Sequence, residues 1–226
     1  GLRAIGQPQQ VTTSDLWHLG SIGKSMTATL VARAVEAGRV QWTDTIGSVL
    51  GAAIPDMRAE YRDVNFRHLL SHRSGLPGNI EMAQLLAFPR DSADPRQDRI
   101  AYARFGLAQA PRGPKEQTFE YSNTGYVIAG AMLEAKLGAP WETLIRQHVF
   151  DPLNMASAGQ GAPGTPGAYD QPVGHALGPT TVTNGVASWP TDVVIVDRIP
   201  DAFEYVGVTI SPAAVADVYR CDVPVA

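Results

Sequence analysis

Glycine and proline are concentrated in residues 159–180, and this stretch separates two parts of the chain that have different patterns. Both residue types oppose regular helices and strands, so we expect a loop there. Before the stretch, apolar residues mostly recur with helical spacing. After it, residues 193–197 and 205–210 are β-rich and short enough to be strands, and a last helix is predicted from Ser211 to Tyr219. The pattern therefore predicts a mainly helical part followed by a part that forms strands.

The clearest helix is predicted over residues 21–37, because apolar side chains recur on one face of it. Gly38 follows directly, at the position where a helix often ends on a left-handed residue. Gly138 stands in the same relation to a helix predicted over residues 122–137. Four more helices are predicted, near residues 66–72, 79–88, 97–109 and 140–148.

The charge and the cysteine content exclude several classes of protein. The chain has 226 residues, and 18 basic against 22 acidic side chains give a net charge of −4. Nucleic-acid-binding proteins normally carry a basic patch, so no nucleic-acid partner is expected. The single cysteine, Cys221, excludes an intrachain disulfide and a cysteine-based zinc site. No apolar run reaches about 18 residues, so no membrane span is expected.

Ser21-Ile22-Gly23-Lys24 stands at the start of the first predicted helix. Side chains three residues apart on a helix are neighbours, which brings the Lys24 amine to the Ser21 hydroxyl. A serine becomes a nucleophile when a neighbouring base takes its proton, and a lysine can be that base. In the alternative interpretation, Ser21 only caps the helix and Lys24 is an exposed residue of its first turn.

Tyr121-Ser122-Asn123 lies at the start of the helix predicted over residues 122–137. A tyrosine beside a lysine can exchange protons with a reacting group as an acid or a base. Asn123 carries both a donor and an acceptor, which suit the amide or ester carbonyl of a substrate. Alternatively, Ser122 or Asn123 caps the helix and Tyr121 packs in the core.

His68 and His72 are four residues apart in a segment that continues to Pro77. Zinc-binding pairs share this spacing, but no glutamate lies between the two histidines and no third ligand is evident. We therefore expect no metal site and no cofactor, and we expect His72 to form structural hydrogen bonds at the end of its helix. The sequence also has no Gly-x-Ser-x-Gly turn, phosphate-binding glycine loop or dinucleotide fingerprint.

Four segments in this order resemble the serine β-lactamase-like family, which includes class C β-lactamases, penicillin-binding DD-peptidases and family VIII carboxylesterases. Leu19–Ala28 is similar to the first motif of that family. His68–Pro77 is similar to a structural signature, and Phe119–Tyr126 resembles the Tyr-x-Asn motif. Val149–Met155 resembles a segment that follows the next helices, so the resemblance runs from about residue 1 to about residue 155.

The resemblance implies an α+β protein with the β-lactamase/transpeptidase-like fold, a largely intact helical domain and a reduced antiparallel sheet. Residues 45–180 would form the mainly helical domain, and residues 1–44 and 181–226 the reduced sheet part.

The resemblance also implies a role for each site residue. Ser21 would be the acylated nucleophile, Lys24 would activate it, and Tyr121 would share the proton transfer. Asn123 would bind the substrate on its carbonyl side. The backbone N–H of Ser21 would supply half of an oxyanion hole, whose donors stabilise a tetrahedral intermediate.

The family's third motif, Lys/His/Trp-x-Gly on a strand near the C-terminal end, is not found, and residues 183–185 are only a weak substitute. The segment before Ser21 is also short. We therefore expect a chain truncated at both ends and a weakened oxyanion hole. Exposed sheet edges would favour pairing with another chain, so a homo-oligomer that completes the sheet is a possible partner arrangement.

The depleted third motif favours small carboxylic esters as substrates, because an ester with a good leaving group is easy to cleave. Hydrolysis of a β-lactam, or kinship with a penicillin-binding DD-peptidase, is the alternative within the same chemistry. A third interpretation is a catalytically weakened binding or interaction module. The N-terminal residues lack a signal sequence, which leaves a cytoplasmic or a periplasmic location open.

Overall fold

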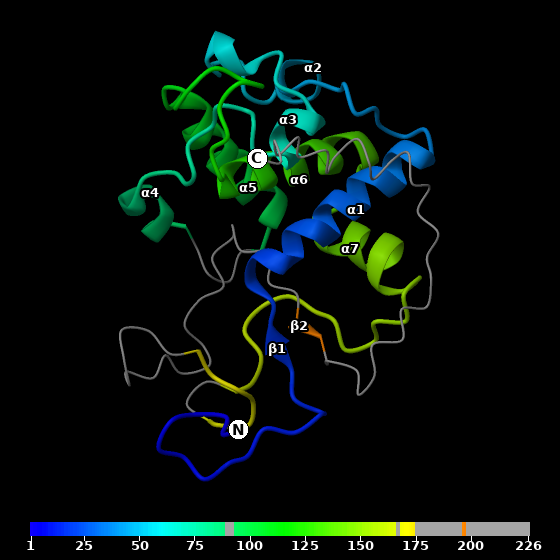
Figure 1. Ribbon diagram of the computed structural model, residues 1–226. Coiled ribbons are helices and arrows are strands. Elements are labelled where there is room, and N and C mark those ends of the chain that lie inside the picture. Colours follow the sequence, from blue (N-terminus) through cyan, green and yellow to red (C-terminus); the bar gives the residue numbers. More distant parts are fainter. Residues whose placement is uncertain (89–92, 166–167, 175–195, 198–226) are drawn as a thin grey trace, which may run out of the picture.

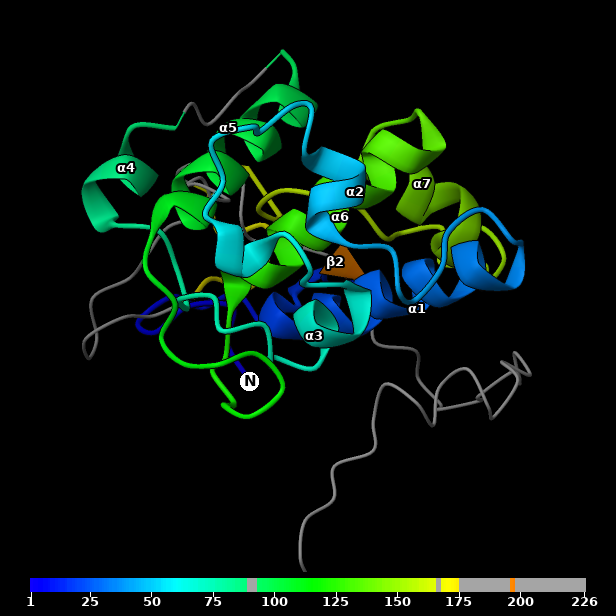
Figure 2. The same ribbon diagram turned by 90° about the horizontal axis from the view of Figure 1, so that it is seen from above.

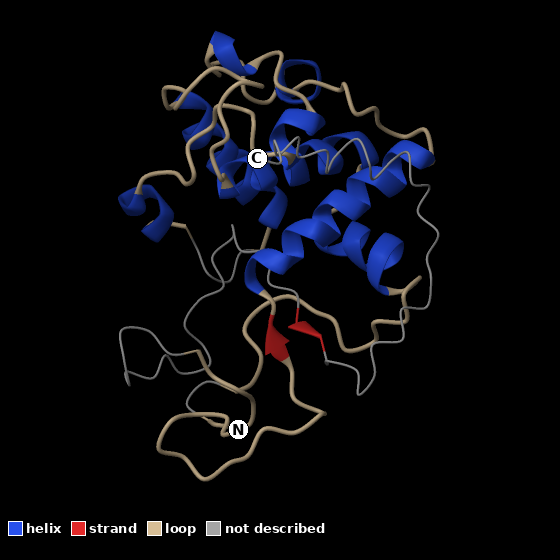
Figure 3. Cartoon of the chain, in the orientation of Figure 1, coloured by secondary structure: helices blue, strands red, loops and turns tan. Residues whose placement is uncertain are grey.

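The computed structural model describes residues 1–88, 93–165, 168–174 and 196–197. The helices gather in one body, and a short pair of strands lies beside the N-terminal segment at one end of it (Figure 1). Figure 3 shows the same division by secondary structure. None of the helices in these ranges has the length and the apolar character that crossing a membrane requires.

The helix predicted over residues 21–37 is present, with a different start. A 3-10 turn, η1 (Gly20–Ile22), leads into α1 (Gly23–Glu36). The N-cap position of α1 is Ile22, which forms no side-chain capping hydrogen bond, so Ser21 does not cap this helix. Gly38 follows with a φ of 66°, in the left-handed region as predicted.

The two other long helices are also present. α5 (Pro95–Ala108) begins two residues before the predicted position, because the Asp94 side chain caps it by accepting from backbone N–H groups in its first turn. A proline at the first helical position adds to this start signal. α6 (Asn123–Leu137) ends on Gly138, whose φ of 77° agrees with the prediction.

The shorter helices differ more from the sequence pattern. The predicted helix at 140–148 becomes α7, which continues as a π-helical turn and ends two residues later than predicted. Five-residue helices show little periodicity, so their ends and some of the helices themselves could not be predicted. These short elements are α2 (Ile46–Leu50), η2 (Ala59–Tyr61), α3 (Phe66–Leu70), α4 (Met82–Leu86), α7 (Trp141–Ile145) and η3 (Arg146–Phe150).

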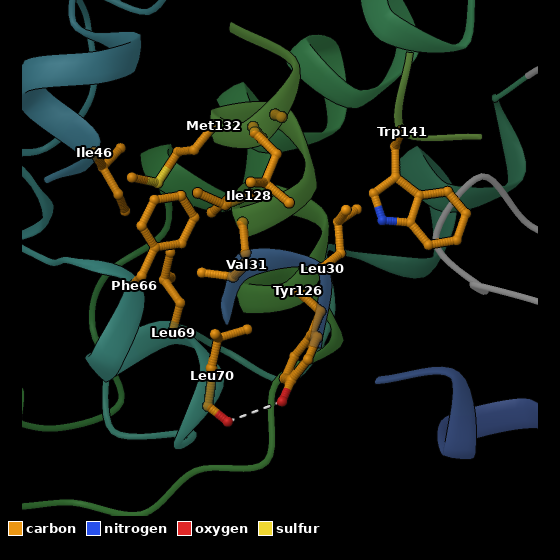
Figure 4. Close-up of a cluster of buried hydrophobic side chains, with 14 of the residues drawn as sticks. Leu30, Val31, Ile46, Phe66, Leu69, Leu70, Tyr126, Ile128, Met132 and Trp141 are labelled. Atoms are coloured by element: carbon orange, nitrogen blue, oxygen red, sulfur yellow. Dashed lines mark hydrogen bonds between the residues drawn. The ribbon is translucent and has the colours of Figure 1, made fainter. Parts of the chain in front are cut away.

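α6 is the central helix of the body, because it packs against α1, α2, α3, α5 and α7. The view from above shows it lying among these helices (Figure 2). Its residues 124–134 are buried on every side, as expected for a helix without a polar face. Leu30 and Val31 of α1, Leu69 of α3 and Ile128 of α6 belong to one buried cluster (Figure 4). These side chains pack α1, α3 and α6 together in the core.

A buried ionic network joins three helices. Arg99 of α5 donates to Glu134 of α6 at 2.6 and 3.0 Å, and to Glu142 of α7 at 2.8 and 2.9 Å. Burial alone would lower the pKa of Arg99, but the hydrogen bonds to Glu134 and Glu142 outweigh it and raise the pKa. Arg99 therefore stays charged inside the body and ties α5 to both neighbours.

The strand part is small in the described residues. β1 (Trp17–His18) pairs antiparallel with β2 (Val196–Asp197), and Trp17 lies opposite Asp197. β2 falls within the strand predicted at 193–197, whose remaining residues lie outside the described ranges. The predicted strand at 205–210 and the predicted helix from Ser211 to Tyr219 also lie outside them. The described residues of the predicted loop 159–180 contain no helix and no extended strand.

The segment before β1 is anchored by long-range hydrogen bonds. The guanidinium of Arg3 donates to the buried carboxylate of Asp15, with an Nε–Oδ2 distance of 3.0 Å. The backbone N–H of Leu16 donates to the side-chain oxygen of Gln171 at 2.6 Å. The N–H of Val173 donates to the carbonyl of Arg3 at 2.9 Å. Residues 168–174 therefore hold the N-terminal segment in place.

Candidate active site

Ser21 and Lys24 meet where η1 passes into α1. The Lys24 ammonium donates to the Ser21 hydroxyl oxygen, with an Nζ–Oγ distance of 3.2 Å. Ser21 is exposed and Lys24 is half-buried, so the hydroxyl is open to an incoming molecule while the amine is partly shielded. The structure therefore brings together the two side chains that the three-residue spacing predicts as neighbours.

Tyr121 reaches the same hydroxyl from the loop before α6. Its phenolic O–H donates to Ser21 Oγ at 2.7 Å. The side chain is 45% exposed, which contradicts the alternative interpretation that Tyr121 packs in the core. Two groups that can carry a proton thus converge on one serine oxygen, from parts of the chain that are 100 residues apart.

The turn before α6 is held by Ser122 and by the segment that contains Gly78. Ser122 is the N-cap of α6 and its hydroxyl accepts from the N–H of Gly125 at 3.0 Å, as the capping interpretation predicted. The same hydroxyl donates to the carbonyl of Pro77 at 2.7 Å. The N–H of Asn123 donates to the carbonyl of Gly78 at 2.8 Å. Tyr121 therefore projects from a turn with few degrees of freedom.

The Asn123 side chain lies beside a residue that the sequence pattern did not single out. Its amide nitrogen donates to the side-chain oxygen of Asn79 at 2.9 Å, which fixes the orientation of the Asn123 amide. Asn79 is exposed and Asn123 is half-buried. The only signal for Asn79 in the sequence is its place two residues after Pro77, at the end of the segment that resembles a structural signature.

The Lys24 ammonium is flanked by two aromatic rings. It lies 5.0 Å from the ring centre of Tyr121 and 5.7 Å from that of Tyr126, within the range of cation–π attraction. Tyr126 is itself fixed, since its hydroxyl donates to the carbonyl of Leu70 at 2.9 Å (Figure 4). These contacts hold the amine beside Ser21.

A profile of the Beta-lactamase family matches residues 1–216 of this chain. The chain belongs to the Beta-lactamase family. It is 33% identical over 159 residues to penicillin-binding protein 4 of Amycolatopsis lactamdurans, covering 69% of this chain and 39% of that protein. It is also 27% identical over 207 residues to a β-lactamase of Pseudomonas fluorescens, covering 91% of this chain and 53% of the relative.

A solved structure agrees with the fold. The crystal structure of a penicillin-binding protein from Bacillus halodurans superposes with a TM-score of 0.66 and 20% identity, covering 88% of this chain and 60% of that chain. The protein thus has the β-lactamase/transpeptidase-like α+β fold, with a helical domain largely intact and a reduced sheet. It spans less than two thirds of the length of each of these three relatives.

The histidines of the predicted pair, His68 and His72, both have structural partners in this member of the Beta-lactamase family. His68 Nδ1 accepts from the N–H of Asn65 at 3.2 Å, and its Nε2 contacts a carboxylate oxygen of Glu116 at 2.7 Å. His72 Nδ1 accepts from the N–H of Ser122 at 3.0 Å, which agrees with the expected structural role. Across the residues that the structure describes, no three His, Cys, Asp or Glu side chains are placed to hold a metal ion.

Proposed function

We propose that this chain carries the catalytic serine of a hydrolase, in which Ser21 is acylated by small carboxylic esters. The observation that supports this proposal is the convergence of the Lys24 amine and the Tyr121 hydroxyl on Ser21 Oγ, at 3.2 and 2.7 Å. A serine hydroxyl becomes a nucleophile when a base within hydrogen-bond distance accepts its proton. Both neighbours of Ser21 meet that distance, and the hydroxyl itself is exposed.

In the proposed reaction, Lys24 reacts as the neutral amine, after it has lost a proton to solvent. Ser21 Oγ attacks the ester carbonyl and its proton passes to the free Nζ of Lys24, with Tyr121 sharing the transfer. The same groups return a proton to the departing alcohol, which leaves an acyl group on Ser21. Water then hydrolyses this acyl-enzyme and regenerates the serine. The backbone N–H of Ser21 stabilises the oxyanion in both steps, and Asn123 binds the substrate next to its carbonyl.

Opening of a β-lactam ring is the second candidate function. It uses the same attack by Ser21, but the leaving amine stays attached to the acyl group. The observation that favours it is the 33% identity to a penicillin-binding protein and the 27% identity to a β-lactamase. Acylation by a β-lactam without rapid hydrolysis would correspond to penicillin binding, and hydrolysis to a β-lactamase.

The test compares the wild-type chain with Ser21→Ala, using p-nitrophenyl acetate, a fluorophosphonate and a chromogenic cephalosporin. Ser25→Ala is the matched control, because Ser25 is an exposed serine one turn further along and its hydroxyl donates to the backbone carbonyl of Ile22. We expect acetate turnover and one fluorophosphonate adduct, both lost in Ser21→Ala and kept in Ser25→Ala.

Each outcome separates the candidates. Cephalosporin turnover at rates that match the acetate would rank β-lactam hydrolysis first. A wild-type chain with neither turnover nor an adduct on Ser21 would contradict both enzymatic proposals and favour a binding module.

A further inference from the structure

The imidazole of His72 packs against the ring of Tyr121. The two rings have their centres 4.5 Å apart at an interplanar angle of 31°. His72 also contacts the ring of Phe119 edge-on at 5.8 Å and the ring of Tyr126 at 5.3 Å. The imidazole is half-buried whereas Tyr121 is exposed, so His72 supplies a large ring surface against which the tyrosine rests.

His72 holds both chain neighbours of Tyr121 as well as its ring. The N–H of Glu120 donates to the carbonyl oxygen of His72 at 2.9 Å. The N–H of Ser122 donates to the Nδ1 atom of the His72 ring at 3.0 Å. One residue therefore holds the backbone of Glu120, the backbone of Ser122 and the face of the Tyr121 ring between them.

The hydrogen bond from Ser122 requires a neutral imidazole. Nδ1 can accept only when it carries no proton, so the ring proton is on Nε2. Among the described residues, Lys24 of α1 is a charged group that acts on the ring, and the titratable side chains of Tyr121 and Tyr126 pack against it. Burial, and then the charge of Lys24, lower the pKa of His72, which agrees with a neutral ring.

We propose that His72 is the positioning residue that holds the Tyr121 hydroxyl at Ser21 Oγ. This inference rests on the proposed function of Ser21. The backbone supports it, because His72 adopts a φ of 60°, a left-handed conformation that aims the ring at Tyr121. Few residues with a side chain take this conformation, and histidine and asparagine are among those that do. An exposed tyrosine without this support samples several rotamers, which separates its hydroxyl from the serine.

The experiment uses two substitutions that tolerate the left-handed backbone. His72→Gly removes both the ring and the acceptor, and His72→Asn removes the ring but keeps an oxygen near the position of Nδ1. Each is combined with Tyr121→Phe, and the rate of Ser21 acylation by p-nitrophenyl acetate is measured together with thermal unfolding. The chain itself is unchanged elsewhere, so the backbone contact with Glu120 remains in every variant.

We expect His72→Gly to slow acylation about 10- to 100-fold, the effect of a misplaced catalytic group. We expect His72→Asn to be faster than His72→Gly, because it keeps the acceptor for Ser122. In the Tyr121→Phe background the same substitutions should have almost no further effect, since residues that act through one another are not additive. Equal losses in both backgrounds, or full activity of His72→Gly, would overturn the proposal.

A second measurement does not depend on activity. Nitrogen-15 NMR of the wild-type chain should show Nδ1 unprotonated and Nε2 protonated in His72 at neutral pH. The Tyr121 ring signals should carry a ring-current shift that disappears in His72→Asn. A wild-type chain that fails to acylate Ser21 but shows these signals would contradict the proposed function alone. The opposite tautomer, or a Tyr121 ring indifferent to His72, would contradict the positioning role even in an active enzyme.

Discussion

The Ser21 hydroxyl receives hydrogen bonds from two side chains that reach it by different routes. Lys24 lies beside Ser21 because the two residues are three positions apart at the start of one helix. Tyr121 lies beside Ser21 because α6, which follows Tyr121, packs against α1. The first contact is local and the second depends on the whole helical domain. The roles of the two groups can be separated by substitutions that remove one contact at a time.

Tyr121→Phe removes the hydroxyl that donates to Ser21 and leaves the ring in place. We expect acylation of Ser21 to slow by about 10²–10⁴, the usual contribution of an acid–base group. Tyr61→Phe is the matched control, because Tyr61 is buried and its hydroxyl donates to the backbone carbonyl of Gln109 at 3.0 Å. The control should lower the free energy of unfolding by about 1 kcal/mol and keep the acylation rate. Equal rates for Tyr121→Phe and the wild type would contradict the role of Tyr121.

Lys24→Met keeps the length of the side chain and removes its amine. The acylation rate is expected to fall by about 10²–10⁴, because the serine loses the group that we propose as its proton acceptor. Lys136→Met is the control, since Lys136 is on the last turn of α6 and pairs with Asp44. Stopped-flow acylation with p-nitrophenyl acetate measures both variants. An unchanged rate in Lys24→Met would show that another group accepts the proton.

How much of the site could be predicted differs from residue to residue. The contact between Ser21 and Lys24 follows from their three-residue spacing alone. The approach of Tyr121 has no local signal, and only the order of the motifs suggested it. The pairing of Asn123 with Asn79 and the contact of His72 with Tyr121 were not predicted, because both depend on the path of the segment around Gly78.

At the scale of elements, sequence and structure agree best for the long helices. α1, α5 and α6 are long enough for their apolar pattern to repeat, and glycines mark the ends of α1 and α6. α2 and η2 have five and three residues, which is too short for periodicity to show. The early start of α5 has a signal in Asp94 and the following proline, which favour a helix start.

Glu134→Gln tests the ionic network that joins α5, α6 and α7. The substitution removes the negative charge of the more buried of the two glutamates that bind Arg99, and leaves part of the Arg99 charge uncompensated. We therefore expect a loss of about 3–5 kcal/mol in the free energy of unfolding. Glu60→Gln is the control, because its ion pair with Arg58 is exposed and should contribute about 0–1 kcal/mol. Urea unfolding measures both. A loss below 1 kcal/mol in Glu134→Gln would show that the network does not stabilise the body.

At the scale of the whole molecule, acid should lower the free energy of unfolding through a carboxylate in the N-terminal segment. The hydrogen bond from Arg3 is the main cause that lowers the pKa of buried Asp15 from 3.8 to about 2. The carboxylate stabilises the folded state above the unfolded pKa, and this stabilisation is lost as the pH falls from about 4 towards 2. We expect it to contribute about 2 kcal/mol at neutral pH, which Asp15→Asn should remove.

Urea unfolding at pH 6 and pH 3 measures this effect in the wild type and in Asp15→Asn. The wild type should lose more stability between the two pH values than the variant does. Asp56→Asn serves as the control, because Asp56 forms an exposed ion pair with Arg104 and should change little. The same pH dependence in wild type and Asp15→Asn would contradict the assignment.

The division into residues 45–180 and two flanking stretches remains a prediction, and so does the homo-oligomer that completes the sheet. β1 and β2 have two residues each, and such a short ladder gains from additional strands. Light scattering of the full chain tests the oligomer, and a strict monomer would contradict it. Much of the predicted strand part lies outside the described residues. The sequence prediction and the structure can therefore be compared mainly in the helical domain.

The separation of Ser21 from Tyr121 by 100 residues also sets the order of events during folding. Helices form within about a microsecond, whereas contacts between distant residues require the closure of a long loop. Helix content should therefore rise before Ser21 becomes reactive. During synthesis, Ser21 leaves the ribosome long before Tyr121, and under the proposed mechanism we expect it to be unreactive until α6 has packed onto the helical body. The time at which Ser21 becomes available for covalent labelling during refolding would therefore report when α6 packs onto the other helices.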